Sequence, residues 1–326
     1  MYKRIIFSLI VIFEVSFIFF LLYHNNYNFN KKDSAPIKET EYADYPLLCQ
    51  EHSNNSKLIL ENIPNFEQYF DGVIEKIRTT HIKINSDGFR DDRNYTIDRS
   101  NNTFRIIVLG DSITFGMGIE NNETYPKVLE RKLNSLNNGI YYEVLNFGVV
   151  GYATIQEVEL LKVKGLKYEA DLVIVCFVGN DAIDPYKSEE LEEKLRKKYN
   201  MTHDSFEEDK IAWWKRFQEY DEEILKVYLK FNNWEKIVQG PLDDLKNISI
   251  KNNFSVLILS WTSLNDQVTH LLKIANKNKW FFVNAYDFLS KYKEEETGIP
   301  TLNYHPNAFG NRVMGEGLFE YLLTNI

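Results

Sequence analysis

From residue 104 onwards, short apolar runs alternate with amphipathic stretches, and this alternation restricts the fold more than any other feature of the chain. Runs rich in branched and aromatic residues, which we predict to be buried strands, occupy 104–109, 141–145, 172–177, 254–259 and 280–283. Helical periodicity occupies 125–136, 155–166, 243–251 and 267–277. The alternation predicts an α/β domain whose parallel sheet of about five strands is covered by helices on both faces.

The start of the chain predicts a membrane anchor. Residues 5–23 include fifteen Leu, Ile, Val or Phe, and as a helix they would span about 29 Å, close to the hydrocarbon thickness of a bilayer. Glu14 costs on the order of 2.5 to 3.5 kcal/mol, less than the apolar residues return. Lys3 and Arg4 precede the run and favour a cytoplasmic N-terminus. A cleaved signal peptide is the alternative, although no small-x-small site follows Tyr23.

We therefore divide the chain into an anchor (1–24), a tether with an N-terminal extension (25–80) and a catalytic domain (81–326) outside the cytoplasm. The extension is expected to hold a short helix at 65–77, followed by an extended stretch at 81–84. An insert over about 184–240 is too long for an ordinary crossover. Its aromatic and aliphatic stripe from Trp213 to Phe231 has helical spacing. That helix either packs on the domain or forms a lid or acyl-binding wall above the site.

Charge and cysteine content exclude several classes of function. The 326 residues carry 38 Lys and Arg against 47 Asp and Glu, a formal net charge of −9, and no basic cluster shows interleaved aromatics, so nucleic acid is not an expected partner. Cys49 and Cys176 have the spacing of neither a zinc site nor a disulfide framework. Cys176 lies within a predicted strand and is expected to be a buried thiol. No metal or cofactor is implied.

Residues that could take part in catalysis follow the first three predicted strands. The run 104–109 ends in Gly-Asp-Ser112, Gly151 follows the second strand and Asn180 follows the third. Active sites of parallel sheets lie at these carboxyl ends. Ser112 would supply a nucleophile, with His305 as a base, while Gly151 and the Asn180 amide would supply donors for an oxyanion. Taken singly, Gly151 is more typical of a glycine turn, and Asn180 is more typical of a helix cap, than of an oxyanion hole.

In this order the blocks resemble the SGNH hydrolase superfamily, also called the GDSL esterase/lipase family. The resemblance runs from about residue 82 to the C-terminus and includes the segments 85–90 and 123–126. It implies a flavodoxin-like three-layer sandwich. It also implies a nucleophilic Ser112, an oxyanion hole of Ser112, Gly151 and Asn180, and a catalytic His305.

The chain departs from the family at the acid of the triad. Members usually place an Asp two or three residues before the His, and here those positions hold Asn303 and Leu302. Asn303 can accept a hydrogen bond from His305 but cannot stabilise an imidazolium by charge. In serine proteases an Asp-to-Asn change at this position costs about 10⁴ in turnover. A Ser–His dyad assisted by a backbone carbonyl is an alternative, and Asp287 is the nearest other acid.

The sequence thus predicts a membrane-anchored serine esterase that hydrolyses or deacetylates an acyl ester of a small molecule, carbohydrate or lipid. Two alternatives remain open at this point. One is an O-acyltransferase acting on cell-envelope carbohydrate, which would use the same serine. The other is a catalytically weakened glycan-binding or scaffold protein, which Asn303 favours.

Overall fold

A five-stranded parallel sheet forms the centre of the computed structural model, which describes residues 49–70, 80–186, 197–198, 233–262, 264–299 and 305–325. Its order is β6-β5-β7-β8-β9, and every neighbouring pair is parallel. The strands are β5 (Thr103–Gly110), β6 (Tyr141–Gly148), β7 (Leu172–Val178), β8 (Ser255–Trp261) and β9 (Phe281–Asn284). Counted along the chain, this is the order 2-1-3-4-5 of flavodoxin-like folds, so the predicted sheet is confirmed.

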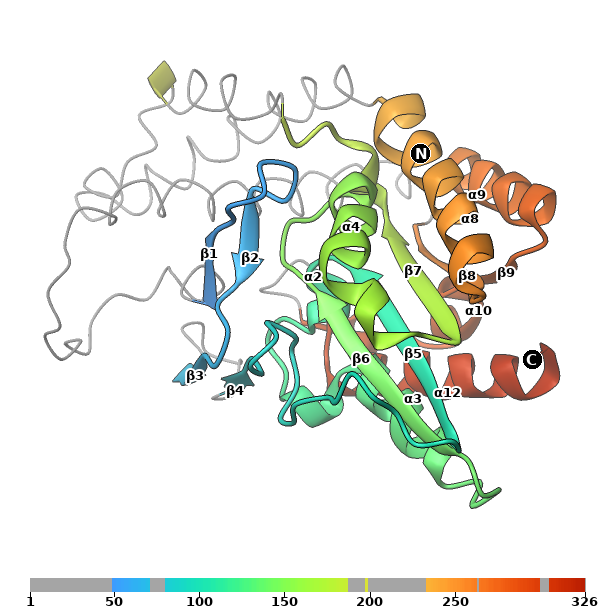
Figure 1. Ribbon diagram of the computed structural model, residues 1–326. Coiled ribbons are helices and arrows are strands. Elements are labelled where there is room, and N and C mark those ends of the chain that lie inside the picture. Colours follow the sequence, from blue (N-terminus) through green and yellow to red (C-terminus); the bar gives the residue numbers. More distant parts are fainter. Residues whose placement is uncertain are drawn as a thin grey trace, which may run out of the picture.

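Helices cover both faces of the sheet, giving three layers (Figure 1). On one face lie α3 (Tyr125–Asn134), α10 (Tyr286–Leu289) and α12 (Ala308–Asn325), and on the other lie α4 (Thr154–Leu160), α8 (Gly240–Asn252) and α9 (Asn265–Asn278). Side chains of β5 alternate between the two cores: Ile106 and Val108 pack towards α3 and α12, while Ile107 and Leu109 pack towards α4, α8 and α9. This period of two fixes which residues each helical layer covers.

The helices predicted from periodicity are present, with local changes in winding. Helix α4 continues as a π-helical turn (Leu161–Gly165) and a 3-10 turn (Leu166–Tyr168), and a π-helical turn (Glu235–Gln239) precedes α8. The remaining short elements are α2 (Ser112–Phe115), two 3-10 turns (Asn121–Glu123 and Gly179–Ala182), α11 (Glu294–Thr297), and the strands β10 (Gly298–Ile299) and β11 (His305–Pro306).

Two antiparallel hairpins precede the sheet. Strand β1 (Gln50–His52) pairs with β2 (Leu60–Asn62), and β3 (Glu67–Phe70) pairs with β4 (Thr80–Lys83). The extended stretch expected at 81–84 is therefore confirmed, but the helix predicted at 65–77 is wrong over Glu67–Phe70, and residues 71–79 lie outside the described part. Gln68 faces Ile82 across the ladder, and such pairing between separate segments overrides local propensity.

Several sequence predictions fall outside the described residues: the anchor at 5–23, the tether up to residue 48 and the stripe from Trp213 to Phe231. Among the residues that the structure describes, no helix combines the length and apolarity needed to cross a membrane. The division at residues 80 and 81 stays a prediction.

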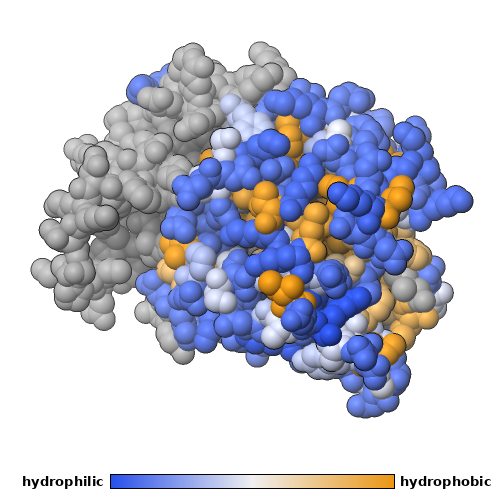
Figure 2. Space-filling view, in the orientation of Figure 1, coloured by the Kyte–Doolittle hydropathy of each residue, from blue (hydrophilic) through white to orange (hydrophobic). Residues whose placement is uncertain are grey.

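A largely hydrophilic surface and two buried cysteines are typical of a globular domain. Figure 2 shows a face made mostly of hydrophilic residues, with hydrophobic ones scattered between them. Cys49 and Cys176 are both buried thiols and form no disulfide with each other. The expectation of a buried thiol at Cys176 is confirmed.

Candidate active site

Ser112 lies at the carboxyl end of β5, where the chain turns directly into α2. Asp111 caps this helix by accepting a hydrogen bond from the Ile113 N–H at 2.9 Å. The end of β6 packs closely on the same turn, since a Cβ atom on Gly148 would lie 2.2 Å from the Phe115 nitrogen. Only a residue without a side chain fits there. The turn therefore holds Ser112 in a fixed position above the sheet.

Arg90 donates hydrogen bonds to the end of α2 and to the chain that follows it. Its buried guanidinium donates to the carbonyl oxygens of Phe115 (3.0 Å), Gly116 (2.9 Å) and Ile119 (2.6 Å), and its Nε donates to Asn121 Oδ1 (2.7 Å). Arg90 ends the segment 85–90, which is part of the resemblance to SGNH hydrolases. Its contacts show that this segment supports the turn from β5 into α2, residues 110–115 (the serine turn), from outside the sheet.

His305 reaches the same point from the other end of the chain. Its Nε2 lies 2.8 Å from Ser112 Oγ, although 193 residues separate the two. Strand β11 pairs with β10, which places His305 opposite Ile299. Asn311 of α12 then ties this region to α3, because its amide donates to Pro306 O (2.8 Å) and its Oδ1 accepts from the Tyr125 N–H (2.9 Å). Both members of the predicted Ser–His pair are thus brought together.

Asn180 also lies at this site, in the 3-10 turn that follows β7. Its Nδ2 is 3.5 Å from Asp111 Oδ2, a long hydrogen bond, and its buried Oδ1 has no hydrogen-bond partner among the described residues. Gln267 supports the turn by donating to the Gly179 carbonyl at 3.1 Å. The Asn180 amide is therefore beside the serine turn.

Gly151 occupies the loop between β6 and α4, residues 149–153. Its φ of +85° lies in the left-handed region that favours glycine. The carbonyl of the preceding residue, Val150, accepts a hydrogen bond from Gln50 Nε2 at 3.1 Å. The sequence signal at Gly151 was its small size, and the structure adds a backbone conformation that requires it.

The triad acid is the part of the site that the described residues leave open. Asn303 and Leu302 lie outside them. Asp287 is exposed in the first turn of α10.

A pair of buried carboxyl groups near the serine turn was missed by the sequence analysis. Burial raises the pKa of Asp111 to about 6, although the hydrogen bond from Ile113 opposes this. Burial, and then the charge of Asp111, raise the pKa of Glu157 well above its ordinary value. Neither Glu157 oxygen has a hydrogen-bond partner among the described residues. Its position one turn after Thr154, on the buried face of α4, is the signal that could have identified it.

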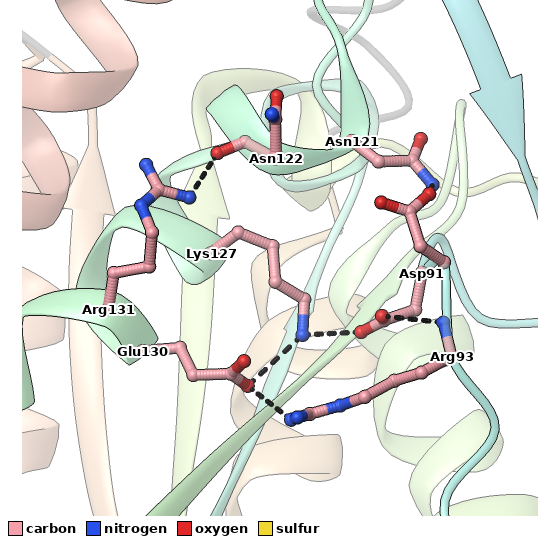
Figure 3. A pocket seen from close by; sticks show the side chains of 8 residues that line it. Asp91, Arg93, Asn121, Asn122, Lys127, Glu130 and Arg131 are labelled. Carbon is pink, nitrogen blue, oxygen red and sulfur yellow. Dashed lines mark hydrogen bonds and ion pairs between the residues drawn. The ribbon is translucent and has the colours of Figure 1, made fainter. Parts of the chain in front are cut away.

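A surface pocket elsewhere on the domain is lined by residues that form ion pairs with one another (Figure 3). Lys127 Nζ contacts Asp91 and lies 3.1 Å from Glu130 Oε2, which also pairs with Arg93 at 2.8 Å. These charges neutralise one another, and none of the proposed site residues lines the pocket.

A serine at a strand tip, hydrogen-bonded to a histidine and flanked by a buried amide, defines a serine hydrolase site on an α/β sheet. The model of the GDSL-like lipase/acylhydrolase family matches residues 108–244, which include Ser112, Gly151 and Asn180 and end before His305. The match covers less than half of the chain, which is similar to this family there, and together with the Ser112–His305 pair it identifies an ester hydrolase.

Comparison with other known proteins adds only distant likenesses. No curated protein matches the chain. A family 3 carbohydrate esterase from Clostridium thermocellum is 14% identical, with 68% of this chain and 96% of that one covered and a TM-score of 0.42. The psychrotrophic esterase EstA from Pseudoalteromonas sp. is 13% identical, with 69% and 98% covered and a TM-score of 0.45. The lipase/acylhydrolase from Enterococcus faecalis is 11% identical, with 67% and 95% covered and a TM-score of 0.42.

Proposed function

We propose that the protein is a serine esterase in which Ser112 attacks the acyl carbonyl and His305 is the general base. The observation that carries this proposal is the 2.8 Å distance between Ser112 Oγ and His305 Nε2. A neutral imidazole accepts the hydroxyl proton as the Oγ–C bond forms, and the imidazolium then returns that proton to the departing alkoxide. Water completes the cycle by hydrolysing the acyl-enzyme with the same base.

The oxyanion of the tetrahedral intermediate would be held by three donors. These are the backbone N–H groups of Ser112 and Gly151 and the side-chain amide of Asn180. Each follows a strand end at the same edge of the sheet, which supports their convergence on one point. Removing a donor of this kind typically lowers turnover by about 10² to 10³.

Asn303 would take the place of the triad acid and accept a hydrogen bond from the Nδ1–H of His305. An amide oxygen orients the imidazole but adds no charge to stabilise the imidazolium. The enzyme would therefore turn over more slowly than one with a carboxylate at this position. Residues 5–23 would anchor it in a membrane, with the catalytic domain outside the cytoplasm and facing ester-bearing carbohydrate or lipid.

The test compares the full-length chain with Ser112→Ala on a short-chain aryl ester. We expect hydrolysis by the wild type, loss of nearly all turnover in Ser112→Ala, and a covalent fluorophosphonate adduct on Ser112 by mass spectrometry. Equal hydrolysis by both proteins would overturn the proposal. Product analysis with a sugar acceptor separates hydrolysis from acyl transfer, because only a transferase forms the acylated sugar.

A further inference from the structure

The N-terminal hairpin β1–β2 is hydrogen-bonded to the loop that carries Gly151. Gln50 and Asn62 donate from the hairpin to the carbonyl oxygens of Val150 and Gly148, both at 3.1 Å. In the other direction, Tyr152 donates its hydroxyl to Leu60 O, and Gln156 donates to Leu58 O at 2.8 Å. Side-chain bonds therefore join the hairpin to the loop, to the end of β6 and to the first turn of α4, between segments about 90 to 100 residues apart.

The two donors from the hairpin act as a matched pair. Gln50 and Asn62 lie directly opposite each other in the antiparallel ladder, so their side chains leave the same face of the hairpin. They are only 3% and 2% exposed. Their two acceptors, Gly148 and Val150, are separated by a single residue of the loop. Buried amides held in this way fix the backbone that they contact, because an unmade buried hydrogen bond is costly.

The bond from Gln50 has a direct geometric consequence for Gly151. The Val150 carbonyl and the Gly151 N–H belong to one planar trans peptide, in which the two groups point in opposite directions. Holding the carbonyl towards the hairpin therefore turns the Gly151 N–H away from it. Without this bond the peptide plane is free to rotate, since Gly151, at φ +85°, has few steric restrictions of its own.

We propose that Gln50, aided by Asn62, is a positioning residue that aims the Gly151 N–H at the reacting ester, so that the hairpin β1–β2 is a working part of the active site. The inference rests on the proposed function, because it assumes that Gly151 is an oxyanion donor. It assigns a role to a segment that precedes the family match at 108–244. A hairpin that only stabilised the fold would change the unfolding temperature and leave turnover per folded molecule unaltered.

The experiment uses the full-length chain with Gln50→Met, which keeps the length of the side chain and removes the donor. Tyr152→Phe is the matched control, since it removes one bond between hairpin and loop whose acceptor, Leu60 O, lies on the hairpin. We measure kcat and KM on an aryl acetate, the affinity for a trifluoromethyl ketone that forms a tetrahedral adduct, and thermal unfolding. Asn62→Ala serves as a second variant in case Gln50→Met does not fold.

For Gln50→Met we expect kcat to fall about tenfold or more, a part of the loss typical of a missing oxyanion donor, with KM within about twofold of wild type. The affinity for the ketone should weaken in proportion to kcat, because both depend on the same oxyanion contact. Tyr152→Phe should keep its kcat. Unchanged kcat and ketone affinity in folded Gln50→Met, or in Asn62→Ala, would overturn the inference while Ser112-dependent hydrolysis stands. If Ser112→Ala is fully active, the proposed function fails first, which separates the two failures.

Discussion

Asp111 and Glu157 are two buried acids that differ in their hydrogen bonds. Asp111 caps α2 and contacts Asn180, whereas Glu157 is 1% exposed and lacks a hydrogen-bond partner among the described residues. A buried carboxylate without donors is strongly disfavoured against its neutral acid. The charge of Asp111 adds to this, so the pKa of Glu157 is raised and Glu157 holds its proton in the folded state.

Glu157→Gln should flatten the pH dependence of stability, because the amide resembles the protonated acid. In the wild type, the contribution of Glu157 to stability is fully present below the unfolded pKa near 4.5. It falls by about 1.4 kcal/mol per pH unit as pH rises towards the higher folded pKa, because only the unfolded chain releases the proton. The measurement is the free energy of unfolding in urea from pH 4.5 upwards. Glu320→Gln, at an exposed position of α12, is the control, and equal slopes in all three proteins would contradict the assignment.

Asn303→Asp should raise turnover by about tenfold or more, since a carboxylate stabilises the imidazolium that forms when His305 takes the proton, and its absence costs about 10⁴ in serine proteases. Asn303→Ala should lower turnover, because it removes the acceptor that orients the ring. Steady-state kinetics on one aryl ester measures both changes. No gain in the Asp variant, together with no loss in the Ala variant, would show that another group orients His305.

The short helix α2 owes its position to close contacts that its own sequence does not reveal. Gly148→Ala would place a methyl group only 2.2 Å from the Phe115 nitrogen. Neither backbone can yield without moving Ser112, so we expect a loss of stability of about 1–3 kcal/mol and a further loss of activity in the folded fraction. Gly179→Ala is the control for stability, because its nearest neighbour would be 3.6 Å away. Urea unfolding distinguishes the two, and equal stability would contradict the contact.

The elements that sequence predicts well are those whose signal is local. Strand β5 appears as an apolar run, and the rule that sites lie at carboxyl ends of parallel strands then selects Ser112, Gly151 and Asn180. Strand β3 was predicted as a helix because its partner β4 comes later in the chain. The same limit hid Gln50, whose acceptor lies 100 residues away. Polar residues that act through a distant backbone carry no pattern of their own.

The domain as described is an α/β fold whose hairpins, serine turn and C-terminal helix meet around one site, and its relation to a membrane depends on residues 5–23. Fifteen apolar residues there favour insertion over the cost of Glu14, and Lys3 with Arg4 favours a cytoplasmic N-terminus. If residues 5–23 insert and the N-terminus is cytoplasmic, every residue after the anchor lies on the opposite side of the membrane from Lys3.

Cysteine labelling tests this orientation, because both native thiols are fully buried and should not react. We would introduce Lys251→Cys at an exposed position of α8 or Lys3→Cys before the anchor, and treat spheroplasts of an expressing bacterium with a membrane-impermeant maleimide. Lys251→Cys should label in intact spheroplasts, whereas Lys3→Cys should label only after permeabilisation. The wild type measures background. Labelling of Lys251→Cys only after permeabilisation would place the esterase in the cytoplasm, and recovery of that variant in the medium would show that residues 5–23 act as a cleaved signal.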